Sequence, residues 1–149
     1  MPDYMETTVG KFIFKVANDR LYTPEGLWVK VANSLARIGV TDFFQQHNGD
    51  VAFATIEPLG TVLALGDEFA SVETIKVNLS LASPISGKIA NVNNLAVSKP
   101  EAINLDPYGE GWLCEVEASR WETEKLKLLS PDQYFMKMKN DAEGEVKQS

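Results

Sequence analysis

The amino-acid sequence predicts a mainly β domain, a sandwich or flattened barrel of short strands with one short internal helix and further helices near the C-terminus. Three observations support this prediction. Short runs of β-branched and aromatic residues alternate with turn residues along most of the chain, and helical patterns occur only in the middle and near the end. At 149 residues, one domain can bury most of a single apolar core without disulfides or metals. Strands this short must then cover each other's apolar faces.

The first half of the chain is expected to contain strands separated by turns. Apolar, β-branched runs predict strands over residues 12–16, 28–31, 35–40, 51–55, 61–65 and 68–75. Turn residues separate several of them, at Asn18-Asp19, Asn33-Ser34 and Pro58-Leu59-Gly60. After the third run, Thr41 or Asp42 could cap a short helix that ends near His47.

The C-terminal part is expected to be helical. Ser119 and Glu122 form a capping-box pattern, in which both side chains satisfy backbone donors at a helix start. Leu126 and Leu129 would continue the apolar stripe of that helix. A second helix is expected to begin at Pro131, because proline is tolerated at the first helical position. Its packing residues would be Tyr134, Phe135 and Met138.

The last ten residues differ in composition from the rest. Residues 140–149 carry mainly charged and small polar side chains, which favours a frayed end. We therefore expect a single domain over residues 1–139, followed by a flexible acidic and polar tail over residues 140–149.

The charge and hydropathy of the chain exclude several classes of function. A formal net charge of -7 would repel a phosphate backbone, so we expect no nucleic-acid partner and instead partners with basic surfaces. No apolar run approaches the roughly 18 residues that span a bilayer. Residues 1–10 lack the basic and then apolar pattern of a secretory signal. We therefore expect a cytoplasmic protein that does not associate with membranes.

Few residues are available for metal binding or nucleophilic catalysis. A single cysteine cannot form an internal disulfide, and a single histidine cannot build a zinc site with so few companions. Cys114 shares a strand face with Trp112 and Val116, which predicts a buried, unreactive thiol; a reactive thiol is the alternative. His47 is expected at the surface near a helix end. Because Ser and Cys catalysis generally needs a base and an orienting group, we expect no catalytic residues and no enzyme activity.

Lys76 stands where two apolar-rich strands meet, between Ile75 and Val77. At a hairpin tip its side chain would project into water. Glu73 is the nearest acid, and an exposed ion pair between the two would contribute at most about 1 kcal/mol. Judged from spacing alone, an ordinary exposed turn lysine is the simpler interpretation.

Two segments indicate a different role for this lysine. Residues 72–87 resemble the lipoyl-attachment hairpin of the glycine cleavage H-protein family, with Glu73 three positions before Lys76 and Gly87 eleven positions after it. Residues 104–112 read Asn-Leu-Asp-Pro-Tyr-Gly-Glu-Gly-Trp. They are similar to the family's Asn-x-Asp-Pro-Tyr-Gly-Glu-Gly-Trp loop almost residue for residue.

The resemblance covers about residues 28–138 and implies a lipoyl/biotinyl-type flattened β-barrel, or hybrid-motif sandwich, that carries a cofactor. Lys76 would hold lipoate as a covalent amide, and Glu73 and Gly87 would be recognised by lipoate-attaching enzymes. A groove near residues 106–112 would shield the loaded arm. The tether would raise the local concentration of the lipoyl sulfurs at docked partners. Biotin is disfavoured, because biotin carriers have methionine on both sides of the lysine.

The chain departs from the typical glycine cleavage pattern near the arm. Gly26-Leu27-Trp28 replaces a His-Glu-Trp sequence, and the acid that usually follows the lysine is missing from Val77-Asn78-Leu79-Ser80. The N-terminal extension through residues 12–22 is also longer than usual. These changes indicate altered partner choice on an unchanged carrier fold.

The departures count against aminomethyl transfer from glycine. The chain resembles the H-like lipoate-binding proteins of bacterial sulfur oxidation, which serve a heterodisulfide-reductase-like complex, and this resemblance implies a sulfur cargo. Thiol-disulfide exchange on the lipoyl sulfurs would need no acid or base from the carrier. The alternatives are a glycine cleavage H-protein that carries an aminomethyl group between the glycine cleavage enzymes, and an unmodified protein–protein interaction module. A monomer would best allow the arm to visit several partners.

Overall fold

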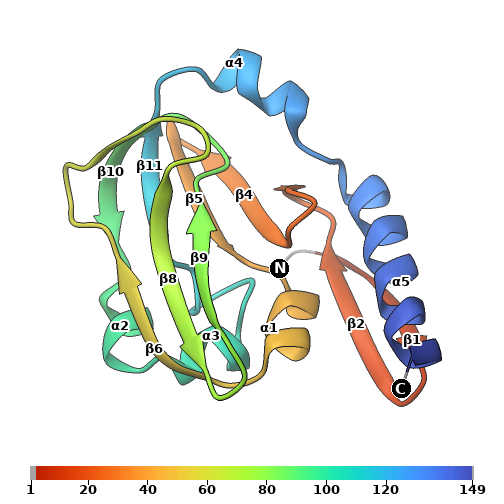
Figure 1. Cartoon of the computed structure of the whole chain (residues 1–149). Coiled ribbons are helices and arrows are strands. Elements are labelled where there is room, and N and C mark those ends of the chain that lie inside the picture. Colours follow the sequence, from red (N-terminus) through yellow and green to blue (C-terminus); the bar gives the residue numbers. More distant parts are fainter. Residues whose placement is uncertain (1–2, 149) are drawn as a thin grey trace.

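The computed structural model describes residues 3–148, and a two-layered β-sandwich forms its centre (Figure 1). Within these residues one layer is a six-stranded sheet, in spatial order β3 (Leu21–Tyr22), β4 (Leu27–Ala32), β5 (Leu35–Val40), β11 (Cys114–Ala118), β10 (Gly87–Val92) and β7 (Val62–Leu63). The other is a three-stranded sheet of β6 (Val51–Ile56), β8 (Glu68–Thr74) and β9 (Asn78–Ala82). Both sheets are antiparallel and open. The predicted mainly β, flattened sandwich is confirmed.

The core between the sheets consists of inward-facing apolar side chains, as strand alternation requires. Its most completely buried members include Ile38, Phe69, Val72, Ile85, Ile89, Leu113 and Val116. Cys114 is buried with them, which confirms the predicted position of its thiol. Burial, with a smaller contribution from the Glu115 charge, raises the pKa of this thiol to about 12.

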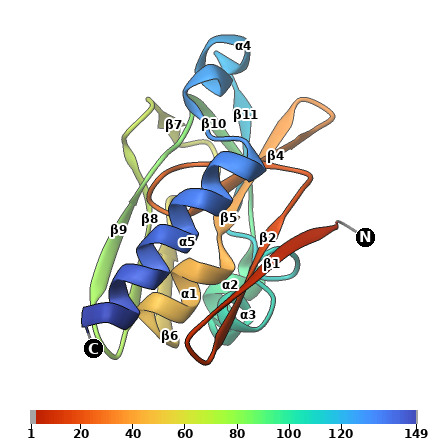
Figure 2. The same ribbon diagram turned by 90° about the vertical axis from the view of Figure 1, so that its right-hand side faces the viewer.

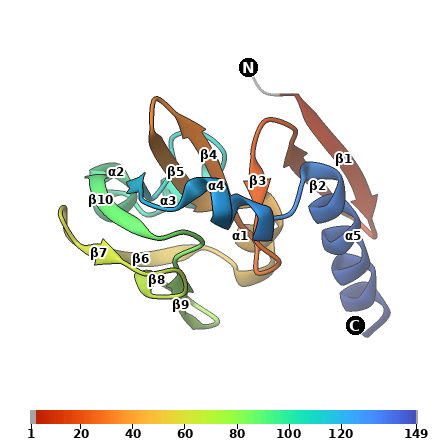
Figure 3. The same ribbon diagram turned by 90° about the horizontal axis from the view of Figure 1, so that it is seen from above.

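A third layer lies outside the sandwich. It consists of a hairpin, β1 (Tyr4–Val9) and β2 (Phe12–Ala17), packed against the long helix α5 (Pro131–Gln148). Figures 2 and 3 show these elements together at one side of the molecule, with α1 (Asp42–Asn48) between them and the sandwich. Tyr22 stacks on Tyr134 with ring centroids 4.5 Å apart and joins this layer to the sandwich.

Helix α5 begins at Pro131 as predicted, and Tyr134 and Met138 are buried. It does not fray at residue 140, because the hairpin provides an apolar surface for its last turns. Ala142 is buried there in the same cluster as Val9 and Phe14. No helix within residues 3–148 is long and apolar enough to cross a membrane.

The remaining helices are short: α2 (Asn94–Ser98), α3 (Glu101–Leu105), α4 (Trp121–Glu124) and a 3-10 turn (Lys125–Lys127). Of the two predicted caps of α1, Thr41 occupies the N-cap position and accepts a hydrogen bond from the Phe44 amide. The capping box predicted for α4 is wrong.

Arg120 occupies the N-cap position of α4 without any side-chain cap, and Leu126 is 79% exposed. The reason is the buried carboxylate of Glu124, which accepts hydrogen bonds from the amide and hydroxyl of Ser86 at 2.7 and 2.6 Å. This contact with the sandwich, together with the packing of Trp121 and Leu128 against the core, fixes the orientation of the helical turn.

Candidate functional site: the Lys76 hairpin tip and the adjoining pocket

Lys76 lies at the tip of the hairpin that connects β8 to β9, as predicted. Thr74 organises this tip. Its amide donates to the Val77 carbonyl at 2.8 Å, and its hydroxyl oxygen accepts hydrogen bonds from the amides of Lys76 and Val77 at 3.2 and 3.1 Å. This is the local turn that threonine hydroxyls favour. It holds Ile75 and Lys76 outward, and Ile75 is 91% exposed.

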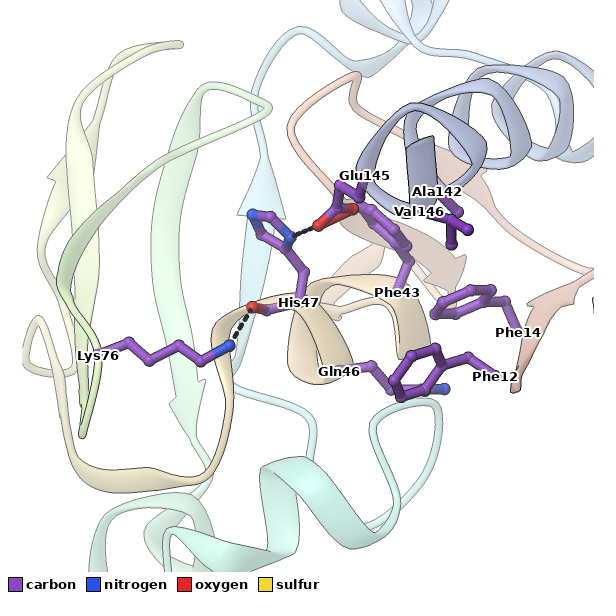
Figure 4. A pocket seen from close by; sticks show the side chains of 9 residues that line it. All are labelled: Phe12, Phe14, Phe43, Gln46, His47, Lys76, Ala142, Glu145 and Val146. Atoms are coloured by element: carbon purple, nitrogen blue, oxygen red, sulfur yellow. Dashed lines mark hydrogen bonds and ion pairs between the residues drawn. The ribbon is translucent and has the colours of Figure 1, made fainter. Parts of the chain in front are cut away.

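The Lys76 side chain extends from the tip towards the C-terminal end of α1 (Figure 4). It passes beside Gly49, where a Cβ would lie 4.0 Å from the lysine Cδ and Cε, and its Nζ donates to the His47 carbonyl at 3.4 Å. No carboxylate within residues 3–148 forms an ion pair with this amine. Glu73 is exposed and lies opposite Phe53 on one neighbouring strand and Asn78 on the other.

Asn104 holds the backbone segment beneath the Lys76 amine, residues 49–51. Its side-chain oxygen accepts from the Val51 amide at 2.8 Å, and its nitrogen donates to the Gly49 carbonyl at 3.0 Å and to Gln45 at 3.2 Å. The first residue of the family-like loop therefore supports the site from behind. It does not contact the amine.

The rest of that loop packs tightly on itself and on the sandwich. A Cβ at Gly109 would lie 2.4 Å from Asp106, and one at Gly111 would lie 2.5 Å from the Ala102 carbonyl. Trp28 donates its indole N–H to the Pro107 carbonyl at 3.0 Å. Asp106, Pro107 and Tyr108 also line a cavity of about 470 Å³ that Lys76 does not line. An arm-shielding groove near residues 106–112 stays a prediction.

The pocket that Lys76 lines is formed by other elements, and its volume is about 320 Å³. Figure 4 shows its lining, contributed by β2, α1, α5 and the hairpin tip: Phe12, Phe14, Phe43, Gln46, His47, Lys76, Ala142, Glu145 and Val146. Phe14 lies 5.3 Å from Phe43 in an edge-to-face arrangement and 6.2 Å from Phe12, measured between ring centroids. The walls are thus mainly aromatic and aliphatic.

A polar pair crosses the pocket rim. His47, exposed in the last turn of α1 as predicted, pairs through Nδ1 with the Glu145 carboxylate of α5. The imidazole also stacks on Phe43, with ring centroids 5.6 Å apart. Glu145 is the one carboxylate among the described residues that line the pocket, and it is engaged in this pair.

Gly87 lies away from the tip, beyond the far end of β9. It is buried at the start of β10, paired with Ala118 of β11 and Leu63 of β7. A Cβ there would lie 2.3 Å from the Glu117 carbonyl oxygen, so the close approach of two strands requires glycine. This packing accounts for Gly87 locally. Its recognition by a lipoate-attaching enzyme stays a prediction.

Thr74 and the residues that form the pocket walls were not identified from the sequence as parts of the site. Thr74 could have been found, because a threonine just before a turn is a known signal for a hydroxyl-organised turn. The pocket walls could not. Phe12 and Phe14 looked like ordinary strand residues, and Glu145 and Val146 fell in the segment expected to be a tail.

The arrangement offers an acylable amine beside an apolar pocket. No group of three or more His, Cys, Asp or Glu residues suited to a metal ion occurs among the described residues. The fold and the site define a class of protein, a two-layered β-sandwich with an exposed lysine at the tip of a hairpin.

Comparisons with known proteins agree with this class. The sequence model of the family described as Glycine cleavage H-protein matches residues 20–141. A probable glycine cleavage system H protein 1 of Saccharolobus solfataricus is 40% identical over 135 residues, covering 90% of this chain and 97% of that protein. The glycine cleavage system H protein of Carboxydothermus hydrogenoformans is 38% identical over 128 residues, covering 86% and 98%.

A solved structure gives the same result. The crystal structure of a glycine cleavage system H protein from Mycobacterium marinum matches with a TM-score of 0.69 at 31% identity, covering 78% of this chain and 94% of that one. The chain belongs to the glycine cleavage H-protein family.

Proposed function

We propose that this chain is a lipoyl carrier that receives lipoate as an amide on the Nζ atom of Lys76. The observation that carries the proposal is the position of this amine: it lies on a tight hairpin tip, makes no ion pair within the described residues, and borders an apolar pocket. These surroundings fit a lipoyl group, because acylation removes the lysine charge and adds an apolar chain. Bound lipoate supplies a redox-active pair of sulfurs.

The protein's own part is to present and orient the arm. Thr74 fixes the direction in which the lysine leaves the turn, and the sandwich behind it keeps the attachment point rigid. A tether on a rigid base raises the effective concentration of its end at any docked partner. A carrier of this kind needs lipoate-attaching enzymes and enzymes that load and unload it, and acts as a monomer.

We further propose that the cargo is a sulfur intermediate, handled with a heterodisulfide-reductase-like complex in the cytoplasm. An aminomethyl cargo carries a basic nitrogen, which a free carboxylate in the pocket beside the arm would stabilise. Val77, Asn78 and Leu79 after the lysine are uncharged, and the carboxylate of Glu145 is already paired with His47. This chemistry favours sulfur transfer by thiol-disulfide exchange.

Glycine cleavage is the second candidate, and the names of the relatives above support it. Reconstitution with glycine cleavage partner enzymes separates the two. The sulfur proposal predicts little or no glycine decarboxylation by the lipoylated chain. Turnover equal to that of a glycine cleavage H-protein run in parallel would overturn it.

Intact-mass measurement tests the attachment itself. The wild-type chain, incubated with lipoate, ATP and a lipoate ligase, should gain one lipoyl increment, and Lys76→Arg should gain none. Lys88→Arg, which changes an exposed lysine on β10, is the matched control and should be modified like wild type. An unmodified wild-type chain would instead favour an interaction module that carries no cofactor.

A further inference from the structure

A cavity of about 470 Å³ lies between strand β2 and the family-like loop, and it is distinct from the pocket of the attachment lysine. The hairpin β1–β2, helix α1 and residues 104–108 line it. Because successive residues of a strand point to opposite sides, Ile13 and Lys15 line this cavity, whereas Phe12 and Phe14 line the pocket of the lysine. We call it the loop cavity.

Hydrogen bonds from two sides hold β2 in place at the loop cavity. The side-chain amide of Gln46 donates to the Ile13 carbonyl at 2.9 Å, and the Lys15 amide donates to Asp42 at 3.0 Å. From the loop, the Tyr108 hydroxyl donates to the Lys15 carbonyl at 2.9 Å. These backbone groups of β2 are already paired, so a partner would be recognised here by side chains and not by the addition of a strand.

The rim of the loop cavity is apolar and uncovered. Tyr4, Ile13 and Leu105 line it and remain 40%, 55% and 81% exposed. Large exposed apolar side chains gathered around one cavity are typical of interaction sites. A small ligand inside the cavity would leave the outer parts of these side chains in water, so the occupant that we expect is part of a protein surface.

Two carboxylates of the loop cavity have no cationic partner. Asp42 and Asp106 line it, and neither forms an ion pair within residues 3–148. Asp106 accepts a hydrogen bond from the Glu110 amide at 2.9 Å. Lys15 is the one cation among the described residues that line the cavity, and its ammonium lies 3.6 Å from Glu6, which does not line it. The cavity therefore complements a basic side chain.

We propose that the loop cavity receives an arginine side chain from an enzyme that loads or unloads the lipoyl arm. The inference rests on the proposed lipoyl carrier function, which requires such enzymes. A guanidinium forms directed hydrogen bonds with carboxylates, while its apolar stem and planar face pack on aliphatic and aromatic side chains. Arginine anchors enclosed by other contacts often dominate the energy of an interface. The net charge of -7 attracts the basic surface that would carry this arginine.

The loop cavity is well placed for such an enzyme. Gln46 lines both this cavity and the pocket that Lys76 lines, so an enzyme docked here lies beside the arm. Tyr4 and Ile13 precede the family match, which begins at residue 20, whereas Leu105 lies within it. The match therefore defines only part of the docking surface, and the hairpin part would select partners particular to this chain.

Two peptide probes test the chemistry that is recognised. Capped Leu-Arg-Leu and capped Leu-citrulline-Leu have nearly the same shape, but only the first is charged. Each is titrated into the isotope-labelled full chain without lipoate, and the amide resonances are followed by NMR. The arginine peptide should cause saturable shifts of the Lys15 and Glu110 amides, which donate to the two aspartates, and should bind about tenfold more tightly than the citrulline peptide.

Matched substitutions separate the loop cavity from the rest of the surface. Leu105→Ser should weaken binding of the arginine peptide about three- to tenfold, whereas Leu126→Ser, which changes a leucine that is 79% exposed outside the cavity, should not. Asp106→Asn should remove the preference for arginine over citrulline. Asp67→Asn is its control, because both aspartates are exposed and each accepts a hydrogen bond from a backbone amide, at 2.9 and 2.8 Å.

The enzyme system that turns over the lipoylated chain gives a second measurement. Leu105→Ser should raise the KM for the carrier about three- to tenfold with little change in kcat, and Leu126→Ser should change neither. Three results would each overturn the docking proposal and leave the lipoyl carrier intact: equal binding of the two peptides, equal weakening by Asp106→Asn and Asp67→Asn, or an unchanged KM for Leu105→Ser. Because peptide binding needs no lipoate, absence of the lipoyl mass is a separate result, and it would overturn the carrier together with the enzyme as occupant.

Discussion

The hydroxyl of Thr74 is the smallest feature on which the site depends. It accepts hydrogen bonds from two backbone amides at the tip, and Thr74→Val would remove both. We expect a loss of about 1 kcal/mol in the free energy of unfolding, together with slower lipoylation of Lys76, because the turn no longer fixes the direction of the lysine. Urea unfolding and timed intact-mass measurements check the two effects. Thr74→Ser keeps the hydroxyl and should restore the lipoylation rate; equal rates for Val and Ser would contradict this role.

Cys114 gives a second prediction at the scale of single residues. Its thiol is buried and its pKa is raised to about 12, so the native protein should resist iodoacetamide at pH 8 and react only after unfolding. Above the ordinary thiol pKa of 9.0 the unfolded state ionises while the folded state stays neutral, so this group costs stability as the pH rises from 9.0 towards 12. Stoichiometric labelling of native protein at pH 8, measured by mass spectrometry, would be the contrary result.

Single residues differ in how far the sequence predicts them. Lys76, Thr41 and Cys114 were placed correctly, because a hairpin tip, a helix start and strand alternation are local properties. Glu122 and Leu126 were placed wrongly. Their positions depend on the two hydrogen bonds between Glu124 and Ser86. These residues are far apart in sequence, so a local pattern cannot predict the contact.

The turn between β2 and β3 is fastened to the rest of the molecule by buried Arg20. Its guanidinium lies over Trp28, 4.5 Å from the ring centroid, donates to the Tyr108 carbonyl at 3.0 Å and pairs with Asp19 at 2.7 Å. Burial alone would raise the pKa of Asp19, but hydrogen bonds and charges from Arg20 and Lys30 together lower it below 3.8.

This lowered pKa predicts an acid sensitivity. A carboxylate with a depressed folded-state pKa contributes stability above pH 3.8 that is lost as the pH falls through the lower folded-state value. Asp19→Asn should therefore lose less stability than wild type between pH 6 and about pH 3, measured by urea unfolding. Asp50→Asn changes an exposed aspartate away from Arg20 and should behave like wild type. An Asp19→Asn profile parallel to that of wild type would disprove the linkage.

Helices and strands were predicted well where the apolar periodicity is strong. They were predicted poorly where contacts with a distant part of the chain stabilise the element. The strands of the sandwich follow from their own runs of β-branched and aromatic residues. The last turns of α5 do not, because the surface that stabilises them is the hairpin at the opposite end of the chain. Residues 140–148 are mainly polar. Among those of them whose side chains are described, Ala142 is the one buried residue.

Ala142 tests this account of α5. Ala142→Asp would place an unpaired carboxylate in the cluster with Val9 and Phe14, at an expected cost of ~2–3 kcal/mol in unfolding free energy. Asn140→Asp adds the same charge at an exposed position of the helix and should stay within about 0.5 kcal/mol of wild type. Chemical denaturation compares them. Equal stability of the two variants would mean that the end of α5 does not depend on the hairpin.

At the scale of the whole molecule, the chain has two parts, and only one of them could be predicted from the sequence. The sandwich and its lysine hairpin lie within the family match, so a resemblance in a few motifs was enough to predict them. The hairpin and the last turns of α5 lie outside that match, and no motif describes them. The attachment lysine lies where the two parts meet, which is why its position was predictable and its surroundings were not.

The net negative charge of the molecule should affect the rate at which a lipoate-attaching enzyme modifies Lys76. With a net charge of -7, the chain favours partners with basic surfaces, and exposed Glu73 is the acid beside the tip. Glu73→Gln should slow ligase-catalysed lipoylation several-fold at low salt, and the difference should shrink as ionic strength rises, since salt screens exposed charges. Glu117→Gln makes the same change on β11, outside the hairpin, and should have little effect. Intact-mass time courses at low and high salt measure both; equal slowing by the two substitutions would show that overall charge, and not Glu73, directs recognition.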